Sequence, residues 1–268
     1  MPILDFHAHI YPDAIAVKAA HAIGEFYEIP MRHDGTVDTL LKQEAAAGVT
    51  HMLVHSVAVT WEKVARINDF IAATVKEHGC LTGFATMHPD HPNIAGEIDR
   101  AIGMGLAGIK LHPDFQHFYI DDEKAYPIYE AIAGRIPLLI HTGDRRYETS
   151  QPKRMARVLD KFPNMKTICA HLGGWSQWSD GHKMLAGRPN VWVDTSSSLY
   201  ALAPEDARAI IGHYGMDRVL FGTDYPMWTP EEELGRLCAL HFEPEEQERI
   251  LYQNGAELLG LSGREGRK

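Results

Sequence analysis

Short apolar runs alternate with amphipathic segments along the whole chain, and this alternation constrains the fold more than any other feature. The apolar runs are rich in β-branched residues, as strands are, and the segments between them carry apolar residues at helical spacing. Successive strands separated by helices must pair in parallel through crossovers. The candidate strands are 3–9, 50–56, 81–87, 107–112, 137–142, 166–171, 191–196 and 218–224. The clearest candidate helices between them are 36–48, 61–79, 93–105, 123–134, 152–162 and 204–215.

Eight strand–helix units in one chain predict a closed α/β barrel. The 268 residues leave about 33 per unit, which is the size typical of a (β/α)8 TIM barrel. The main rival, a doubly wound open sheet, usually has a glycine-rich phosphate turn after its first strand, where this chain has His-Ala-His. We therefore expect a single domain over residues 1–268, with its site at the C-terminal ends of the strands and an additional helix over 13–28.

Composition indicates which binding partners and which cellular compartment to expect. The 26 Lys and Arg against 36 Asp and Glu give a net charge of −10, which disfavours nucleic-acid binding. Three cysteines without a CxxC motif favour a reducing compartment. The N-terminus does not resemble a signal peptide, and the stretch 45–61, which lacks Asp, Glu, Lys and Arg, is too short for a membrane helix. We expect a soluble cytoplasmic protein.

Histidines gather where the predicted strands end. In a parallel strand, residues i and i+2 point the same way, so His7 and His9 both face the barrel mouth, with Asp5 on the same face to support them. An HxH motif alone is equally well explained as two polar residues on one face. The histidines at or just past strand ends are His7, His9, His55, His88, His112, His141 and His171.

Three further strand ends favour a metal site. His141 and His171 close apolar runs, and Asp224 ends the last one. An unpaired polar group at the rim of a buried strand is costly, so these groups are expected to have partners. Imidazoles and a carboxylate with an open coordination position are typical of catalytic zinc.

The motifs that carry these residues resemble those of the amidohydrolase superfamily, in the amidohydrolase-related branch that includes aminocarboxymuconate semialdehyde decarboxylase and several lactone and carboxylate hydrolases. The resemblance implies one divalent metal ion per chain, usually Zn²⁺, bound by His7, His9, His141 and Asp224. It also implies that His171 is a catalytic or orienting group and that Asp224 takes a proton from the metal-activated water. The motifs are DFHAHI (5–10), GIKLHPDFQ (108–116), LLIHTGD (138–144), ICAHLGG (168–174) and LFGTDYP (220–226).

Lys110 has three interpretations. The resemblance offers a carbamylated lysine that bridges two metals, as in superfamily members with two ions. In the single-metal branch it would instead hold a substrate carboxylate as a point charge. It is equally well explained by a salt bridge at the barrel base. We keep Lys110 and its neighbour His112 as candidate substrate-binding residues.

Loops after the strands add further candidates, because such loops set specificity in barrels. Arg145 could clamp a carboxylate, although the Arg145–Arg146 pair is also typical of a solvated surface cluster. Trp228 is interpreted as a packing residue. The remaining substrate-binding candidates are Gln116, Tyr119 and Trp175.

These residues predict a metal-dependent hydrolase that cleaves an ester, lactone or amide of a small, carboxylated molecule. The alternative is a metal-dependent non-oxidative decarboxylase, a lyase acting on a small aromatic or unsaturated carboxylic acid. Both reactions need the same metal ligands, so the sequence does not separate them. A silent binding module is disfavoured because the full ligand set is present. The partner expected is a small molecule, and a homodimer is compatible with these features.

Overall fold

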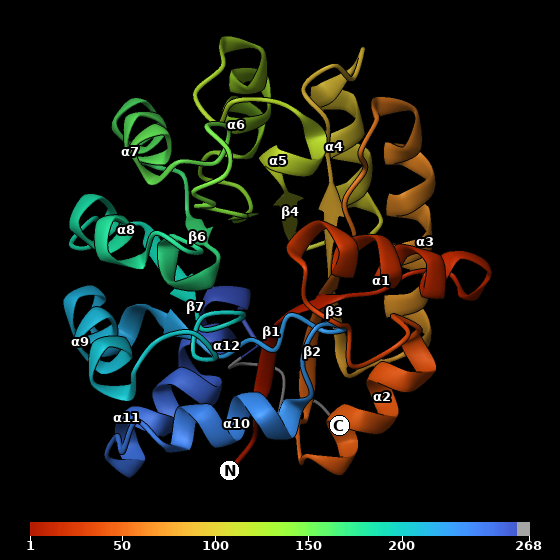
Figure 1. Ribbon diagram of the computed structural model, residues 1–268. Helices are drawn as coiled ribbons and strands as arrows, with labels where there is room; N and C mark the ends of the chain where they lie inside the picture. The colour runs from red at the N-terminus through yellow and green to blue at the C-terminus, as the bar shows by residue number, and fades with distance from the viewer. Residues whose placement is uncertain (262–268) are drawn as a thin grey trace. The chain divides into compact units, whose positions relative to one another are not determined.

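The computed structural model describes residues 1–261 (Figure 1). Within them, eight strands form one sheet whose order follows the chain. Strands β3 to β7 pair in parallel. Every predicted strand is present. The strands are β1 Leu4–His9, β2 His51–His55, β3 Leu81–Thr86, β4 Gly108–Leu111, β5 Leu138–Ile140, β6 Thr167–Cys169, β7 Val191–Asp194 and β8 Val219–Leu220.

The first and last strands lie side by side, and this closes the sheet. The Phe6 N–H donates to the Phe221 carbonyl at 2.8 Å, and the His9 N–H donates to the Tyr225 carbonyl at 2.8 Å. A sheet in sequential order whose two end strands bond to each other has no free edge. The fold is therefore the (β/α)8 barrel that the sequence predicts.

The chain divides into two compact units. The terminal unit comprises Met1–Leu53 and the chain from Asp194 onwards, and the central unit comprises Val54–Val193. The single-domain boundary of 1–268 stays a prediction. Helices of the terminal unit are α1 Asp13–Tyr27, α2 Val37–Ala46, α9 Pro204–Tyr214, α10 Pro230–Cys238, α11 Pro244–Glu248 and α12 Asn254–Leu259. Those of the central unit are α3 Val64–Glu77, α4 Ile94–Gly103, α5 Pro113–Gln116, α6 Tyr126–Ile132, α7 Pro152–Lys161 and α8 Trp178–Leu185.

Local sequence signals explain where several helices begin. The Thr36 side chain caps α2 by accepting the Thr39 N–H, and Thr229 and Glu232 form a reciprocal capping box at the start of α10. The predicted crossover helices and the additional helix near 13–28 are all present. The sequence prediction did not name α5, α8, α10, α11 or α12, each of which spans nine residues or fewer and therefore shows little periodicity.

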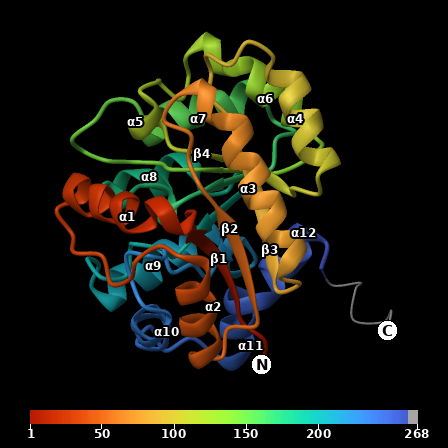
Figure 2. The same cartoon turned by 90° about the vertical axis from the view of Figure 1, so that its right-hand side faces the viewer.

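Gly108 shows how closely two strands of the central unit pack. Gly108 on β4 pairs with Phe84 on β3, and a Cβ at position 108 would collide with the Phe84 ring. Figure 2 shows α3 running along β3 on its outer side. Strands β3 and β4 are almost wholly buried, as expected for parallel strands covered on both faces.

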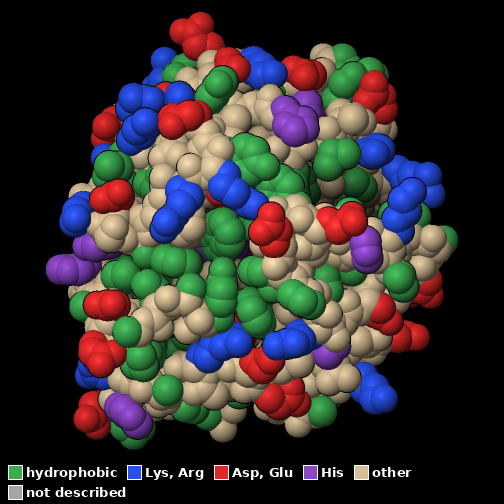
Figure 3. Space-filling view, in the orientation of Figure 1, with side chains coloured by type: hydrophobic (Ala, Val, Ile, Leu, Met, Phe, Trp, Pro, Cys, Tyr) green, Lys and Arg blue, Asp and Glu red, His purple; other side chains and the backbone are tan. Residues whose placement is uncertain are grey.

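No helix within residues 1–261 is long and apolar enough to cross a membrane. On the face drawn in Figure 3, acidic and basic side chains are interspersed. The net charge of −10 is thus not gathered into one patch on that face.

Candidate metal centre

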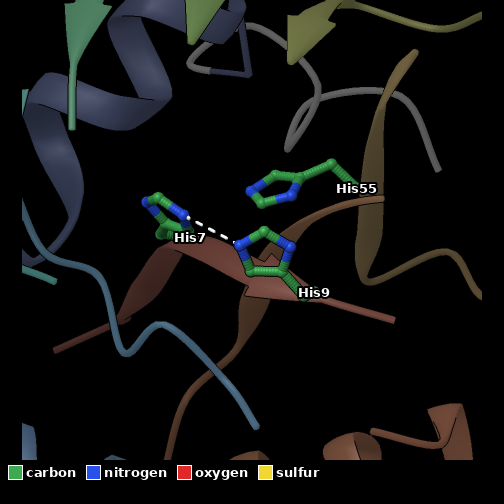
Figure 4. A group of neighbouring side chains, drawn as sticks. All are labelled: His7, His9 and His55. Atoms are coloured by element: carbon green, nitrogen blue, oxygen red, sulfur yellow. Dashed lines mark hydrogen bonds between the residues drawn. The ribbon is translucent and has the colours of Figure 1, made fainter. Parts of the chain in front are cut away.

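β1 presents His7 and His9 from one face of the strand, as the i, i+2 spacing predicts. Figure 4 shows the two rings beside each other, and the dashed line joins their Nε2 atoms, which are 3.3 Å apart. Both residues are buried, with 0% and 7% of their surface exposed. The strand therefore aims two imidazole nitrogens at one point inside the terminal unit.

Asp224 supplies a third donor atom to the same point. Its Oδ1 lies 3.5 Å from His7 Nε2 and 3.4 Å from His9 Nε2. The Asp224 N–H donates to the His7 carbonyl at 2.8 Å, which fixes the loop after β8 against β1. Gly222 permits this approach, because a Cβ there would lie 2.9 Å from the His7 Cβ. We call these three atoms, His7 Nε2, His9 Nε2 and Asp224 Oδ1, the terminal-unit triad.

The terminal-unit triad fits a divalent cation. Ligand atoms about 2.1 Å from one ion lie about 3.0–3.4 Å from each other in octahedral or tetrahedral geometry. The separations in the triad are 3.3, 3.5 and 3.4 Å. Two neutral imidazoles and a carboxylate are also the donor types that zinc and manganese accept. Geometry and chemistry of these residues both agree with a metal ion.

Asp194, at the end of β7, orients His7 and was not identified from the sequence. Its Oδ2 lies 2.9 Å from His7 Nδ1, and both side chains are fully buried. A carboxylate on Nδ1 keeps the proton there, so that Nε2 carries the lone pair that can bind a metal. His141 and Asp224 were identified because each is a polar residue at the end of an apolar run. Asp194 also ends an apolar run, so the same rule could have identified it.

Replacing Asp194 by asparagine is expected to lower the affinity for a divalent cation by roughly 10- to 100-fold, the usual cost of losing such a partner. An amide accepts less strongly than a carboxylate, and its NH₂ group favours the tautomer that blocks His7 Nε2. Isothermal titration with Mn²⁺ and Zn²⁺ measures this. Asp217→Asn is the matched control, since the Asp217 side chain is 61% exposed. Equal affinities in both variants would remove Asp194 from the centre.

Asp5 supports the site through the backbone and not through an imidazole ring. Its Oδ1 accepts the N–H groups of His7 at 3.0 Å and Thr223 at 2.9 Å, and its Oδ2 accepts the Thr223 hydroxyl at 2.6 Å. It thus joins β1 to the loop that carries Asp224. Burial raises the pKa of Asp5 to about 6, against hydrogen bonds that lower it.

The central unit gathers a second histidine cluster at its strand ends. The His141 ring stacks on the His112 ring at 4.1 Å between centroids, and the His171 ring meets the His141 ring edge-on at 4.9 Å. His141 Nε2 lies 3.4 Å from Asp114 Oδ2. Burial raises the pKa of Asp114 to about 6, partly opposed by hydroxyl hydrogen bonds from Thr149 and Ser150. The sequence prediction missed Asp114 because it follows β4 inside a short helix.

The side-chain amide of Gln116 forms hydrogen bonds to three backbone groups. Its Nε2 donates to the Ala58 carbonyl at 2.8 Å and the Met87 carbonyl at 2.7 Å, and its Oε1 accepts the His112 N–H at 2.9 Å. Both N–H groups of this amide are thus used within the fold, and a substrate-binding role for Gln116 stays a prediction.

The other predicted substrate-binding residues divide by burial. Tyr119 is 45% exposed and lies under the Arg154 guanidinium. Arg145 is exposed and donates to the Ser176 carbonyl at 2.6 Å, which agrees with the surface interpretation. Lys110 is fully buried on β4, and Trp175 is 8% exposed. Only Lys110 and Trp175 of these four keep the burial expected of a site interior.

Comparison with known proteins identifies the family. A family model described as Amidohydrolase matches residues 4–261. The chain belongs to the amidohydrolase 2 family. The resemblance inferred from the strand-end motifs is thus confirmed, and the chain is an enzyme of the amidohydrolase superfamily.

Individual relatives of this amidohydrolase add detail. It is 27% identical over 125 residues to the decarboxylase orsB of Emericella nidulans, a match that covers 39% of this chain and 37% of that protein, so about a third of the relative is matched. A TIM-barrel protein from Bordetella bronchiseptica superposes with a TM-score of 0.78 at 20% identity, covering 98% of this chain and all of the other. A dihydroxybenzoic acid decarboxylase from Polaromonas sp. JS666, solved with bound manganese and 2-nitroresorcinol, gives 0.75 at 18% identity and 98% coverage of both chains.

Proposed function

We propose that this amidohydrolase is a metal-dependent, non-oxidative decarboxylase of a small aromatic carboxylic acid. The observation that carries the metal dependence is the terminal-unit triad with Asp194 behind His7. The choice of reaction follows relatives described as decarboxylases. Hydrolysis, the first expectation from the sequence, has less support among them and becomes the alternative outcome of the test.

The proposed metal ligands are His7, His9, His141 and Asp224, around one divalent cation per chain. The triad geometry supports three of them, and the family resemblance supplies His141. The sequence favours zinc, whereas the Polaromonas relative binds manganese, and the nitrogen and oxygen donors suit both ions. Manganese is therefore the first ion to supply. When bound, the cation would act as a Lewis acid toward oxygen atoms of the substrate.

The protein's own groups have distinct roles in this proposal. Decarboxylation breaks the bond between a ring carbon and the carboxylate, leaves the electron pair on the ring carbon, releases CO₂ and adds a proton to that carbon. Asp224 takes a proton from solvent and passes it to this carbon, and His171 orients the substrate by a hydrogen bond. Lys110 offers a point charge to an anionic substrate, and its complete burial would strengthen that attraction. His112 and Trp175 complete the proposed lining.

The test follows solvent atoms into the product. The protein, loaded with Mn²⁺ or Zn²⁺, is incubated in D₂O with a panel of hydroxylated benzoic acids that includes 2,6-dihydroxybenzoate. We expect CO₂ release and one deuterium at the vacated ring carbon. A parallel panel of lactones, esters and amides is run in ¹⁸O-labelled water. Label in a product carboxylate, with no CO₂ from any acid, would reject decarboxylation in favour of hydrolysis.

A further inference from the structure

Two buried residues with left-handed backbones meet beside the terminal-unit triad. Ser197 has φ 45° and Asp224 has φ 59°, a region that non-glycine residues rarely adopt. The Ser197 hydroxyl donates to Asp224 Oδ2 at 2.5 Å. Strained backbones of this kind persist where the surrounding structure needs the side chain in one place. The contact therefore indicates that the fold holds the Asp224 carboxylate in one orientation.

Trp228 sets the direction of the Ser197 hydroxyl. The indole Nε1–H of Trp228 donates to Ser197 Oγ at 3.0 Å. An indole N–H can only donate, so it occupies a lone pair of the hydroxyl and turns the O–H proton outward. Within residues 1–261, the hydroxyl proton has two acceptors, Asp224 Oδ2 and the Met227 sulfur at 3.2 Å, and the carboxylate is much the stronger of them.

The indole itself is only 6% exposed and is contacted by a guanidinium and by an aromatic ring. The Arg236 guanidinium lies 4.4 Å above the Trp228 ring, and its ion pair with the buried Glu233 keeps it there. The Tyr200 ring packs against the same indole at 4.8 Å between centroids. A cation over the ring face also favours this indole position electrostatically. Trp228 therefore has a fixed position from which it donates a hydrogen bond to Ser197, whereas the sequence suggested a packing role alone.

We propose that Trp228 and Ser197 form a positioning relay that makes Asp224 a single-oxygen metal ligand. The relay occupies Oδ2, so only Oδ1 is presented to the His7 and His9 nitrogens, 3.5 and 3.4 Å away. Without it, the carboxylate can rotate and offer both oxygens to the cation. This inference rests on the proposed metal site and assigns two residues, neither of which is a predicted ligand.

The experiment measures Mn²⁺ binding without any substrate. Wild type, Ser197→Gly and Trp228→Phe are titrated with Mn²⁺ while electron paramagnetic resonance follows free and bound ion. Glycine suits the left-handed backbone, so Ser197→Gly removes the hydroxyl without adding strain. We expect its affinity to fall roughly 10- to 100-fold and the bound-ion spectrum to change. Trp228→Phe should cause a smaller loss with a spectral change of the same kind, because the hydroxyl remains but is no longer directed.

Ser198→Ala is the matched control, since its hydroxyl donates to the Ser196 carbonyl at 3.0 Å in the same loop. Wild-type affinity and spectrum in both relay variants would overturn the relay while leaving the metal site intact. An equal loss in Ser198→Ala would also overturn it, as a general effect of the loop. If wild type binds no Mn²⁺, the proposed function itself fails and the relay with it. Should Ser197→Gly not fold, Trp228→Phe decides alone.

Discussion

Alanine in place of His7 or His9 is expected to abolish tight binding of the divalent cation. Each imidazole supplies one of the proposed bonds to the ion, and no neighbouring side chain in the triad duplicates it. A metal site of four ligands binds with about 10–16 kcal/mol, so losing one ligand costs roughly 10²- to 10³-fold in affinity. Elemental analysis of protein purified without chelator should show close to one ion per wild-type chain and far less in either variant.

The control for this experiment is His21→Ala, because the His21 side chain is 72% exposed on α1 and lies in the same unit. Circular dichroism should be alike in all the proteins, since a barrel core does not depend on one ion. Wild-type affinity in both His7→Ala and His9→Ala would reject the site. Two ions per wild-type chain would instead favour the bridging role of Lys110 over the single-metal assignment.

Asparagine at Asp224 is expected to reduce decarboxylation by at least about 10³-fold, within the usual size of acid–base effects. The amide cannot carry the proton that the ring carbon needs, and it is a weaker metal ligand than a carboxylate. CO₂ release is measured at saturating Mn²⁺, which separates lost chemistry from lost metal. Cation affinity should fall in the same variant.

His171→Asn is compared with Asp224→Asn to separate a residue that orients the substrate from one that also binds the metal. It should keep the metal and lose about 10²-fold in turnover, because an orienting group contributes to the reaction without ligating the ion. Asp217→Asn, with its exposed side chain, should match wild type in both measurements. An unchanged rate in His171→Asn would reduce His171 to a packing residue, and full activity in Asp224→Asn would reject the proposed proton donor.

Gln116 and Asp194 show what a local sequence pattern does not encode. Gln116 was expected to bind substrate, but its amide is used by three backbone groups, two of them on Ala58 and Met87. Asp194 was overlooked, although it holds a ring that lies 187 positions away in the chain. In both residues, hydrogen bonds between distant segments decide what the side chain does, and no local pattern encodes those bonds.

The sequence by itself determined the barrel and the strand ends at which the candidate site residues lie. Hydrophobic periodicity depends on neighbouring residues, and parallel strands bring their C-terminal ends together, so His7, His9 and Asp224 were identifiable as residues at strand ends. Only the tertiary structure decided how these side chains are oriented. Asp194 contacts His7 Nδ1 and Ser197 contacts Asp224 Oδ2, because a ring or a carboxylate can rotate until a partner from another segment of the chain fixes it.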